Sequence, residues 1–161
     1  MNRESLVLLA AAVLLCAAVL GFAGRHLETP GLYYDEVIQA TPASEFLREG
    51  GRPLGIPGAR NTRLLGGWFP LMTQPYMSAL KSQLLIPVFG VFGADGETLR
   101  RATLVWGCIG LVLCMLWMRA VWGVGIAVLA ASLLALDPSF LLVARHDWGS
   151  VSLALICRGG G

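Results

Sequence analysis

The sequence predicts an all-α polytopic membrane protein with three full transmembrane helices, a truncated fourth and a large outer loop carrying short juxtamembrane helices. Composition gives the class, because 56% of the 161 residues are hydrophobic and only 14% are charged, whereas soluble domains carry about 25% charged residues. Long apolar runs on either side of one polar, Gly/Pro-rich stretch give the layout.

Charge and cysteine usage exclude two other classes. The net charge is +2 and the basic residues are scattered, so no nucleic-acid partner is expected. The cysteines lie in or beside apolar runs without a CxxC pair, which argues against a metal centre or a disulfide framework. We expect them to act as small hydrophobic residues; they are Cys16, Cys108, Cys114 and Cys157.

The first element is an unbroken apolar run over residues 6–23, preceded by Arg3. Its length is close to the ~20 residues that cross a bilayer. A cleaved signal peptide is the alternative, but signal cores usually run only ~7–15 residues, so an uncleaved first helix (1–23) is favoured. Arg3 predicts a cytoplasmic N-terminus, which puts the chain from residue 24 on the outer side.

Residues 24–101 are predicted to form the outer loop. Thr41-Pro42 has the pattern of a helix N-cap followed by proline at the first helical position. A short interfacial helix over 42–49 is expected, ended by Gly50-Gly51. Residues 53–75 are expected to be irregular, with Trp68 and Phe69 at the headgroup level.

Residues 75–93 are ambiguous, because the uninterrupted apolar part, 84–94, is short for a span. The segment either lies along the interface or crosses the membrane. Residues 102–118 and 121–142 are predicted transmembrane helices, and Asp137-Pro138 interrupts the second pattern. A second outer loop over 143–150 follows. Residues 151–161 are expected to be a truncated helix, so the chain is expected to be a fragment.

The topology decides which polar residues share a face of the membrane. If 75–93 does not cross, Asp35-Glu36 and Arg145-His146-Asp147 both face outward; if it crosses, they face opposite sides. The short apolar part and the charge of Lys81 favour the first layout.

The ordered set of motifs resembles polytopic membrane glycosyltransferases of the C type, in particular the protein mannosyltransferase and aminoarabinose-transferase-like family. The order and spacing carry the resemblance, and each piece alone is weak. The matching stretches are Tyr33-Tyr34-Asp35-Glu36, Glu45-Phe46-Leu47-Arg48-Glu49-Gly50-Gly51, Gln74-Pro75-Tyr76 with Ala79-Leu80-Lys81, Pro87-Val88-Phe89-Gly90-Val91-Phe92-Gly93, and Leu136-Asp137-Pro138-Ser139-Phe140 followed by Arg145-His146-Asp147.

The resemblance implies an inverting transfer of a sugar from a polyprenyl-phosphate donor to an acceptor at the non-cytoplasmic face. It implies an integral protein of the bacterial plasma membrane, with 75–93 on the outer side. This chain would be the N-terminal part of such an enzyme and inactive alone. Gln74 stands where some relatives have an acidic residue, which weakens the case for a metal site there.

Site residues follow from this reading. Asp35 is the expected base, and Glu36 is expected to orient it or to bind acceptor or metal. The alternative is that Asp35 and Glu36 merely begin a helix, where the dipole favours acids. A divalent metal ion is a possible cofactor, with Asp35 and Asp147 as candidate ligands.

The other candidates would contact the donor. Arg145 suits a phosphate, and His146 and Asp147 adjoin it; the alternative for this trio is an interfacial salt bridge. Lys81 would contact phosphate or extend to the membrane surface. Tyr34 would stack on a sugar or belong to an interfacial aromatic belt.

Two other functions remain open. A non-catalytic membrane scaffold is favoured by small residues in the later spans, which permit close helix packing. A transporter is less well supported, because three spans and part of a fourth are too few for the usual repeat architecture.

Overall fold

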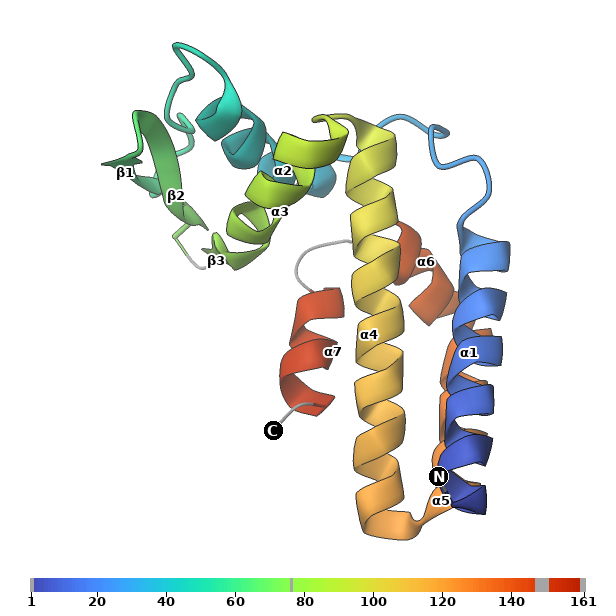
Figure 1. Ribbon diagram of the computed structural model, residues 1–161. Coiled ribbons are helices and arrows are strands. Elements are labelled where there is room, and N and C mark those ends of the chain that lie inside the picture. Colours follow the sequence, from blue (N-terminus) through green and yellow to red (C-terminus); the bar gives the residue numbers. More distant parts are fainter. Residues whose placement is uncertain (1, 76, 147–150, 160–161) are drawn as a thin grey trace. The chain divides into compact units, whose positions relative to one another are not determined.

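The computed structural model describes residues 2–75, 77–146 and 151–159, and the chain is mostly helical (Figure 1). It divides into two compact units. One comprises Met1–Leu27 with Thr103–Gly161, and the other is Glu28–Ala102.

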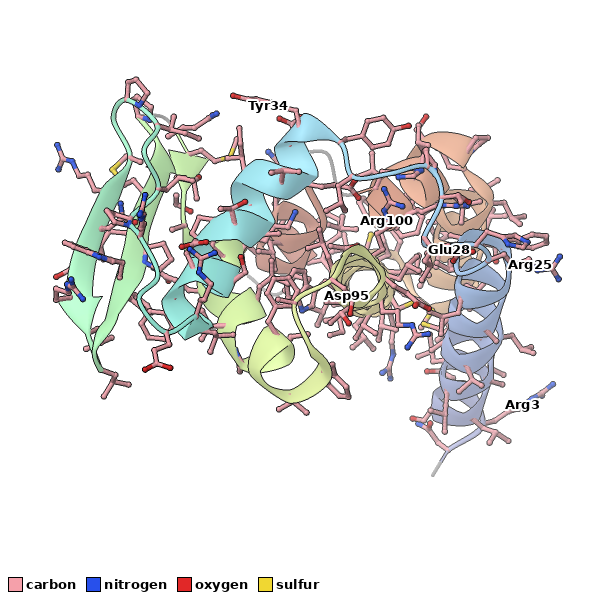
Figure 2. All side chains as sticks on the ribbon, turned by 90° about the horizontal axis from the view of Figure 1, so that it is seen from above. Arg3, Arg25, Glu28, Tyr34, Asp95 and Arg100 are labelled. Atoms are coloured by element: carbon pink, nitrogen blue, oxygen red, sulfur yellow. The ribbon has the colours of Figure 1, made fainter. Side chains whose placement is uncertain are left out.

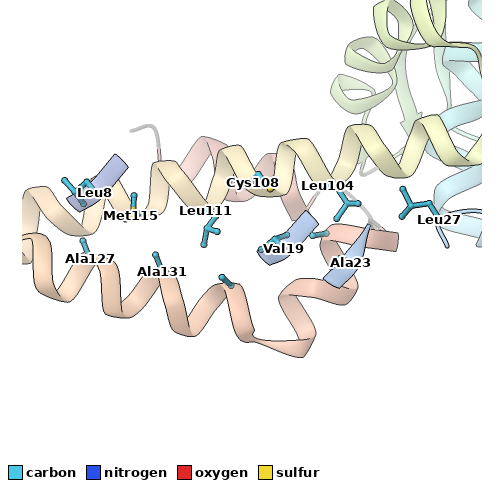
Figure 3. Packing of buried hydrophobic residues seen from close by; sticks show 12 residues of the cluster. Leu8, Val19, Ala23, Leu27, Leu104, Cys108, Leu111, Met115, Ala127 and Ala131 are labelled. Carbon is cyan, nitrogen blue, oxygen red and sulfur yellow. The ribbon is translucent and has the colours of Figure 1, made fainter. Parts of the chain in front are cut away.

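The first unit is helical. It contains α1 (Arg3–Ala23), most of α4 (Gly96–Trp122), α5 (Val124–Leu136), α6 (Pro138–His146) and α7 (Val151–Gly159). Helix α1 packs against α5 and α6. The buried side chains form one apolar cluster (Figure 3), which includes Leu8, Val19, Leu104, Cys108, Leu111, Met115, Ala127 and Ala131.

Two of these helices, α1 and α4, are long and apolar enough to cross a membrane. Each exceeds the ~20 residues that a bilayer core requires. Most of the residues in their apolar stretches are not buried inside the chain, as expected of surfaces that face lipid. The coarse prediction of a helical membrane protein is therefore supported.

The predicted span over 121–142 is not one straight helix. Helices α5 and α6 meet at a bend of 65° around Asp137. The Asp137 carboxylate accepts hydrogen bonds from the backbone N–H groups of Ser139 (2.6 Å) and Phe140 (3.0 Å), and Pro138 occupies the first position of α6. A capping side chain and a proline start a new helix here. The described chain thus has two candidate spans, or three if this bent pair counts as one, in place of the three full spans and a fourth that were predicted.

Other helix boundaries also differ from the sequence predictions. Helix α4 starts at Gly96, before the predicted 102, and continues through Arg119 to Trp122. Gly123, which separates α4 from α5, has a φ of 84° that glycine adopts easily. Helix α6 extends to His146, into the predicted outer loop over 143–150; residues 147–150 lie outside the described part.

The second unit begins with α2 (Tyr34–Leu47). The sequence predicted a helix starting at Pro42, but the proline lies inside α2. The helix starts earlier because the Glu36 side chain caps its first turn, accepting from the N–H of Tyr33 at 2.8 Å. Thr41-Pro42 therefore does not mark a helix start.

A three-stranded antiparallel sheet replaces the irregular loop predicted over 53–75. Its strands are β1 (Arg60–Leu64), β2 (Gly67–Gln74) and β3 (Met77–Ser78), in the order β1-β2-β3. Strand β2 packs against α2, where Phe69 meets Phe46 edge to face at 5.7 Å. Phe69 is thus a packing residue of this unit. Because β1 is polar and lacks the alternating apolar residues that mark a strand, the hairpin could not be predicted from the sequence.

Helix α3 (Leu80–Phe92) corresponds to the ambiguous segment. It packs along α2 and touches β2. Its 13 residues span only about 20 Å, which is less than a ~30 Å hydrocarbon core. This length favours the layout in which residues 75–93 do not cross.

Candidate functional site

The most tightly built polar site joins the first turn of α2 to the first turns of α4. Glu36 and Arg100 are 0% and 1% exposed. Arg100 donates from Nε to Glu36 Oε1 at 2.8 Å and from Nη2 to Glu36 Oε2 at 2.9 Å. This is the bidentate geometry in which a planar guanidinium binds a carboxylate most strongly.

Arg100 also holds the segment that precedes α2. Its Nη1 donates to the carbonyl oxygen of Pro30 at 2.7 Å, and its Nη2 to that of Gly31 at 3.1 Å. A buried charge is tolerated only when it is paired and hydrogen-bonded, and both conditions are met here. The Glu36–Arg100 pair therefore fixes where α2 begins.

Asp35 and Tyr34 lie on the other side of the same turn. Asp35 is exposed, and Tyr34 is 73% exposed and extends away from α2 (Figure 2). Consecutive helical positions differ by about 100° around the axis, so Glu36 faces inward while its neighbours face outward. The two carboxylates that the sequence placed together thus have different environments.

This arrangement bears on the roles expected of the acidic pair. Both oxygens of Glu36 accept hydrogen bonds from within the unit, so Glu36 is engaged in holding the turn that carries Asp35. Asp35 keeps a solvent-facing carboxylate on a fixed helical turn. The two residues do begin a helix, as the alternative reading held.

Lys81, in α3, is 1% exposed. Gln39 of α2, Thr73 of β2 and Ser82 of α3 are further buried polar residues of the same unit. Ser82 Oγ donates to the carbonyl oxygen of Gln39 at 2.7 Å, and Gln39 Nε2 donates to Met77 Sδ. A lysine inside this unit does not extend along its surface in the way that a snorkelling side chain does.

Arg145 and His146 lie at the end of α6, in the other unit. Arg145 Nη2 donates to the carbonyl oxygen of His26 at 2.7 Å, which ties α6 to the segment after α1. His146 is 5% exposed. Asp147 lies outside the described residues.

A metal ion would need several carboxylate, imidazole or thiolate ligands close together. Over residues 2–75, 77–146 and 151–159, no group of three or more His, Cys, Asp or Glu side chains gathers as metal ligands would. Of the acidic pair, only Asp35 is exposed.

Sequence reasoning missed Arg100 as a site residue. It is 64 positions from Glu36, and no local pattern links the two. A weak signal existed, because an arginine just ahead of a long apolar helix needs a counter-charge if it becomes buried, but nothing in the sequence named that partner.

Comparison with protein families, with characterised proteins and with solved structures finds no match to this chain.

Proposed function

We propose that this chain belongs to an inverting membrane glycosyltransferase that transfers a sugar from a polyprenyl-phosphate donor to an acceptor, with Asp35 as the base. One observation supports this most directly: Asp35 is an exposed carboxylate on a helical turn fixed by the Glu36–Arg100 pair. Catalytic groups need such support, because small displacements of a reacting group are costly.

The chemistry follows from the carboxylate. Asp35 takes the proton of an acceptor hydroxyl as its oxygen bonds to the anomeric carbon. The bond from that carbon to the phosphate oxygen breaks, and the polyprenyl phosphate leaves with the electron pair. A cation beside the departing phosphate lowers the barrier. Arg145, which is half-buried, suits this role better than Lys81, which is fully buried in its unit.

Tyr34 has a corresponding role in donor or acceptor binding. Its ring is 73% exposed and adjoins Asp35 in the chain, and an exposed aromatic face offers a surface on which a sugar ring can stack. His146, the last residue of α6, and Asp147, which follows it in the sequence, would position the donor. This one exposed tyrosine would contribute more to the affinity for donor or acceptor than to the rate of transfer.

The membrane layout is part of the proposal. Helix α1 runs from the cytoplasmic side outward, residues 24–95 stay outside, α4 returns inward, and the bent α5–α6 pair crosses outward again. Arg3 and Arg119 then lie on the cytoplasmic side, as the positive-inside tendency favours. Asp35 and Arg145 face the same, outer side, in a bacterial plasma membrane.

The test is the Asp35→Asn variant of the protein that contains this chain, in its own membranes. Polyprenyl-phosphate-linked mannose, glucose and aminoarabinose would be offered as labelled donors. We expect transfer to fall by about 10²–10⁴-fold, the usual contribution of a general base, with unchanged membrane insertion. Normal transfer by the variant would exclude Asp35 as the base.

Glu49→Gln is the matched control, because Glu49 is an exposed carboxylate of the same unit and should leave transfer unchanged. An equal loss in this variant would point to a general effect of charge.

A non-catalytic scaffold is the second candidate, and one observation favours it. Gly107 and Gly110 of α4 lie against Ala144 and Leu155, where an added Cβ would come within 3.0 Å of each neighbour. Close packing through small residues is how membrane helices associate. A scaffold of this kind would retain its partners after Asp35→Asn and show no transfer with any donor.

A further inference from the structure

We propose that the turn of the β1–β2 hairpin inserts into the headgroup region of an anionic lipid membrane. Strand β1 ends at Leu64 and β2 begins at Gly67, so Leu65 and Gly66 form the turn (Figure 1). Leu65 is 92% exposed and Leu64 is 46% exposed. The tip of the hairpin therefore presents two adjacent leucines away from the unit.

Turn geometry does not account for a leucine at this position. Leu65 has a φ of 50° and Gly66 a φ of 84°, and both values are typical of the tightest hairpin turn. That turn favours asparagine, aspartate or glycine at its first position, because other side chains are disfavoured at positive φ. A strained, bulky, apolar residue at an exposed tip points to a binding role.

Basic and aromatic groups stand directly behind the tip. The Arg63 guanidinium lies 4.2 Å from the centre of the Trp68 ring, and Arg63 Nη1 donates to the carbonyl oxygen of Gly66 at 3.2 Å. Arg60, on the same strand, is also exposed. With the leucines at the tip and arginine and tryptophan behind them, the hairpin matches the layers of a membrane interface. There, arginine meets anionic headgroups and tryptophan lies between water and hydrocarbon.

The chain holds this unit near a bilayer. The residues from Glu28 to Ala102 are joined to α1 at one end and continue into α4 at the other, and both helices are long and apolar enough to cross a membrane. Tethering raises the local concentration of lipid around the unit, so even a weak insertion is populated. This proposal is independent of any transferase activity.

The experiment uses the full chain in nanodiscs of phosphatidylcholine with or without phosphatidylglycerol. A Leu65→Cys variant, with the four native cysteines replaced by alanine, would carry an environment-sensitive fluorophore. We expect quenching by spin-labelled acyl chains and protection from aqueous iodide. Glu49→Cys, exposed in the turn that follows α2 in the same unit, is the control and should show the reverse.

Charge provides a second readout. In anionic nanodiscs, Arg63→Gln should lower the ratio of inserted to water-exposed fluorophore by about fivefold, the usual effect of one basic residue near such a surface. In neutral nanodiscs the ratio should not change. Arg48→Gln, an exposed arginine at the end of α2, should have no such effect.

Equal iodide access at positions 65 and 49 would overturn the proposal. So would an Arg63→Gln variant whose fluorophore responds equally in anionic and neutral nanodiscs. Protection from iodide without acyl-chain quenching would also overturn it, because it would indicate a protein partner. If the cysteine-free chain does not fold, hydrogen exchange of the unmodified chain decides. The turn amides should exchange about fivefold more slowly in anionic than in neutral nanodiscs, and equal rates would refute insertion.

Discussion

At the scale of single residues, the Glu36–Arg100 pair fixes the start of α2 in the second unit. One guanidinium binds both oxygens of a carboxylate and two backbone carbonyls, and the two charged side chains are closed to solvent. Removing one partner of such a pair leaves an uncompensated buried charge, which is far more costly than losing an exposed ion pair.

We therefore expect Arg100→Met to lower the free energy of unfolding by about 3–5 kcal/mol. The Glu36→Gln, Arg100→Met double variant should lose less than the two single variants together, because the second change removes the stranded charge. Unfolding in mixed detergent micelles measures both. Strict additivity would mean that the pair does not act as a unit.

The adjacent Arg101 supplies the control. It pairs with Glu97 on the same helix, with side-chain exposures of 69% and 47%. An exposed pair of this kind contributes at most about 1 kcal/mol, so Arg101→Met should leave stability almost unchanged. A large loss in this variant would show that any arginine at the start of α4 is needed.

At the scale of elements, the approach of α4 to α6 depends on glycine. A Cβ on Gly107 would lie 3.0 Å from the Cβ of Ala144, and alanine has no rotamer by which to move away. The two backbones would have to separate. The sequence showed that small residues are present here, but it could not show which neighbour each one meets.

Gly107→Ala should therefore destabilise the first unit by about 1–3 kcal/mol, the usual effect of overpacking. Gly125→Ala in α5 is the matched control, since an added Cβ there meets no atom within 4 Å and alanine favours a helix. Detergent unfolding of both variants measures the difference. Equal stability would mean that α4 and α6 do not pack closely.

The sheet and the bent helix pair show why some elements were predicted and others were not. The span at α1 follows from composition alone, because its 21 residues are almost all apolar. The hairpin depends on β2 packing against α2, with Phe69 on Phe46, which is a tertiary contact. The sequence signal at Asp137-Pro138 did mark the break between α5 and α6, but the 65° bend needed the structure.

For the whole molecule, the proposed membrane layout makes the clearest prediction. Cysteines introduced by Asp35→Cys and Asp147→Cys should both react with a membrane-impermeant maleimide from the outer side of intact cells. Arg119→Cys, at the last turn of α4, should react only after the membrane is opened. Labelling of positions 35 and 147 from opposite sides would exclude a shared site.

The sequence by itself determined the class of this protein and the main apolar helices, because hydrophobicity over a span is a local property. It also located the acidic pair near the start of the polar segment that follows α1. Only the tertiary structure separated the two carboxylates. Arg100, 64 residues away, buries and pairs Glu36, and Asp35 is left exposed on the turn that this pair holds. Burial and pairing depend on distant parts of the chain, so no reading of adjacent residues could assign the two roles.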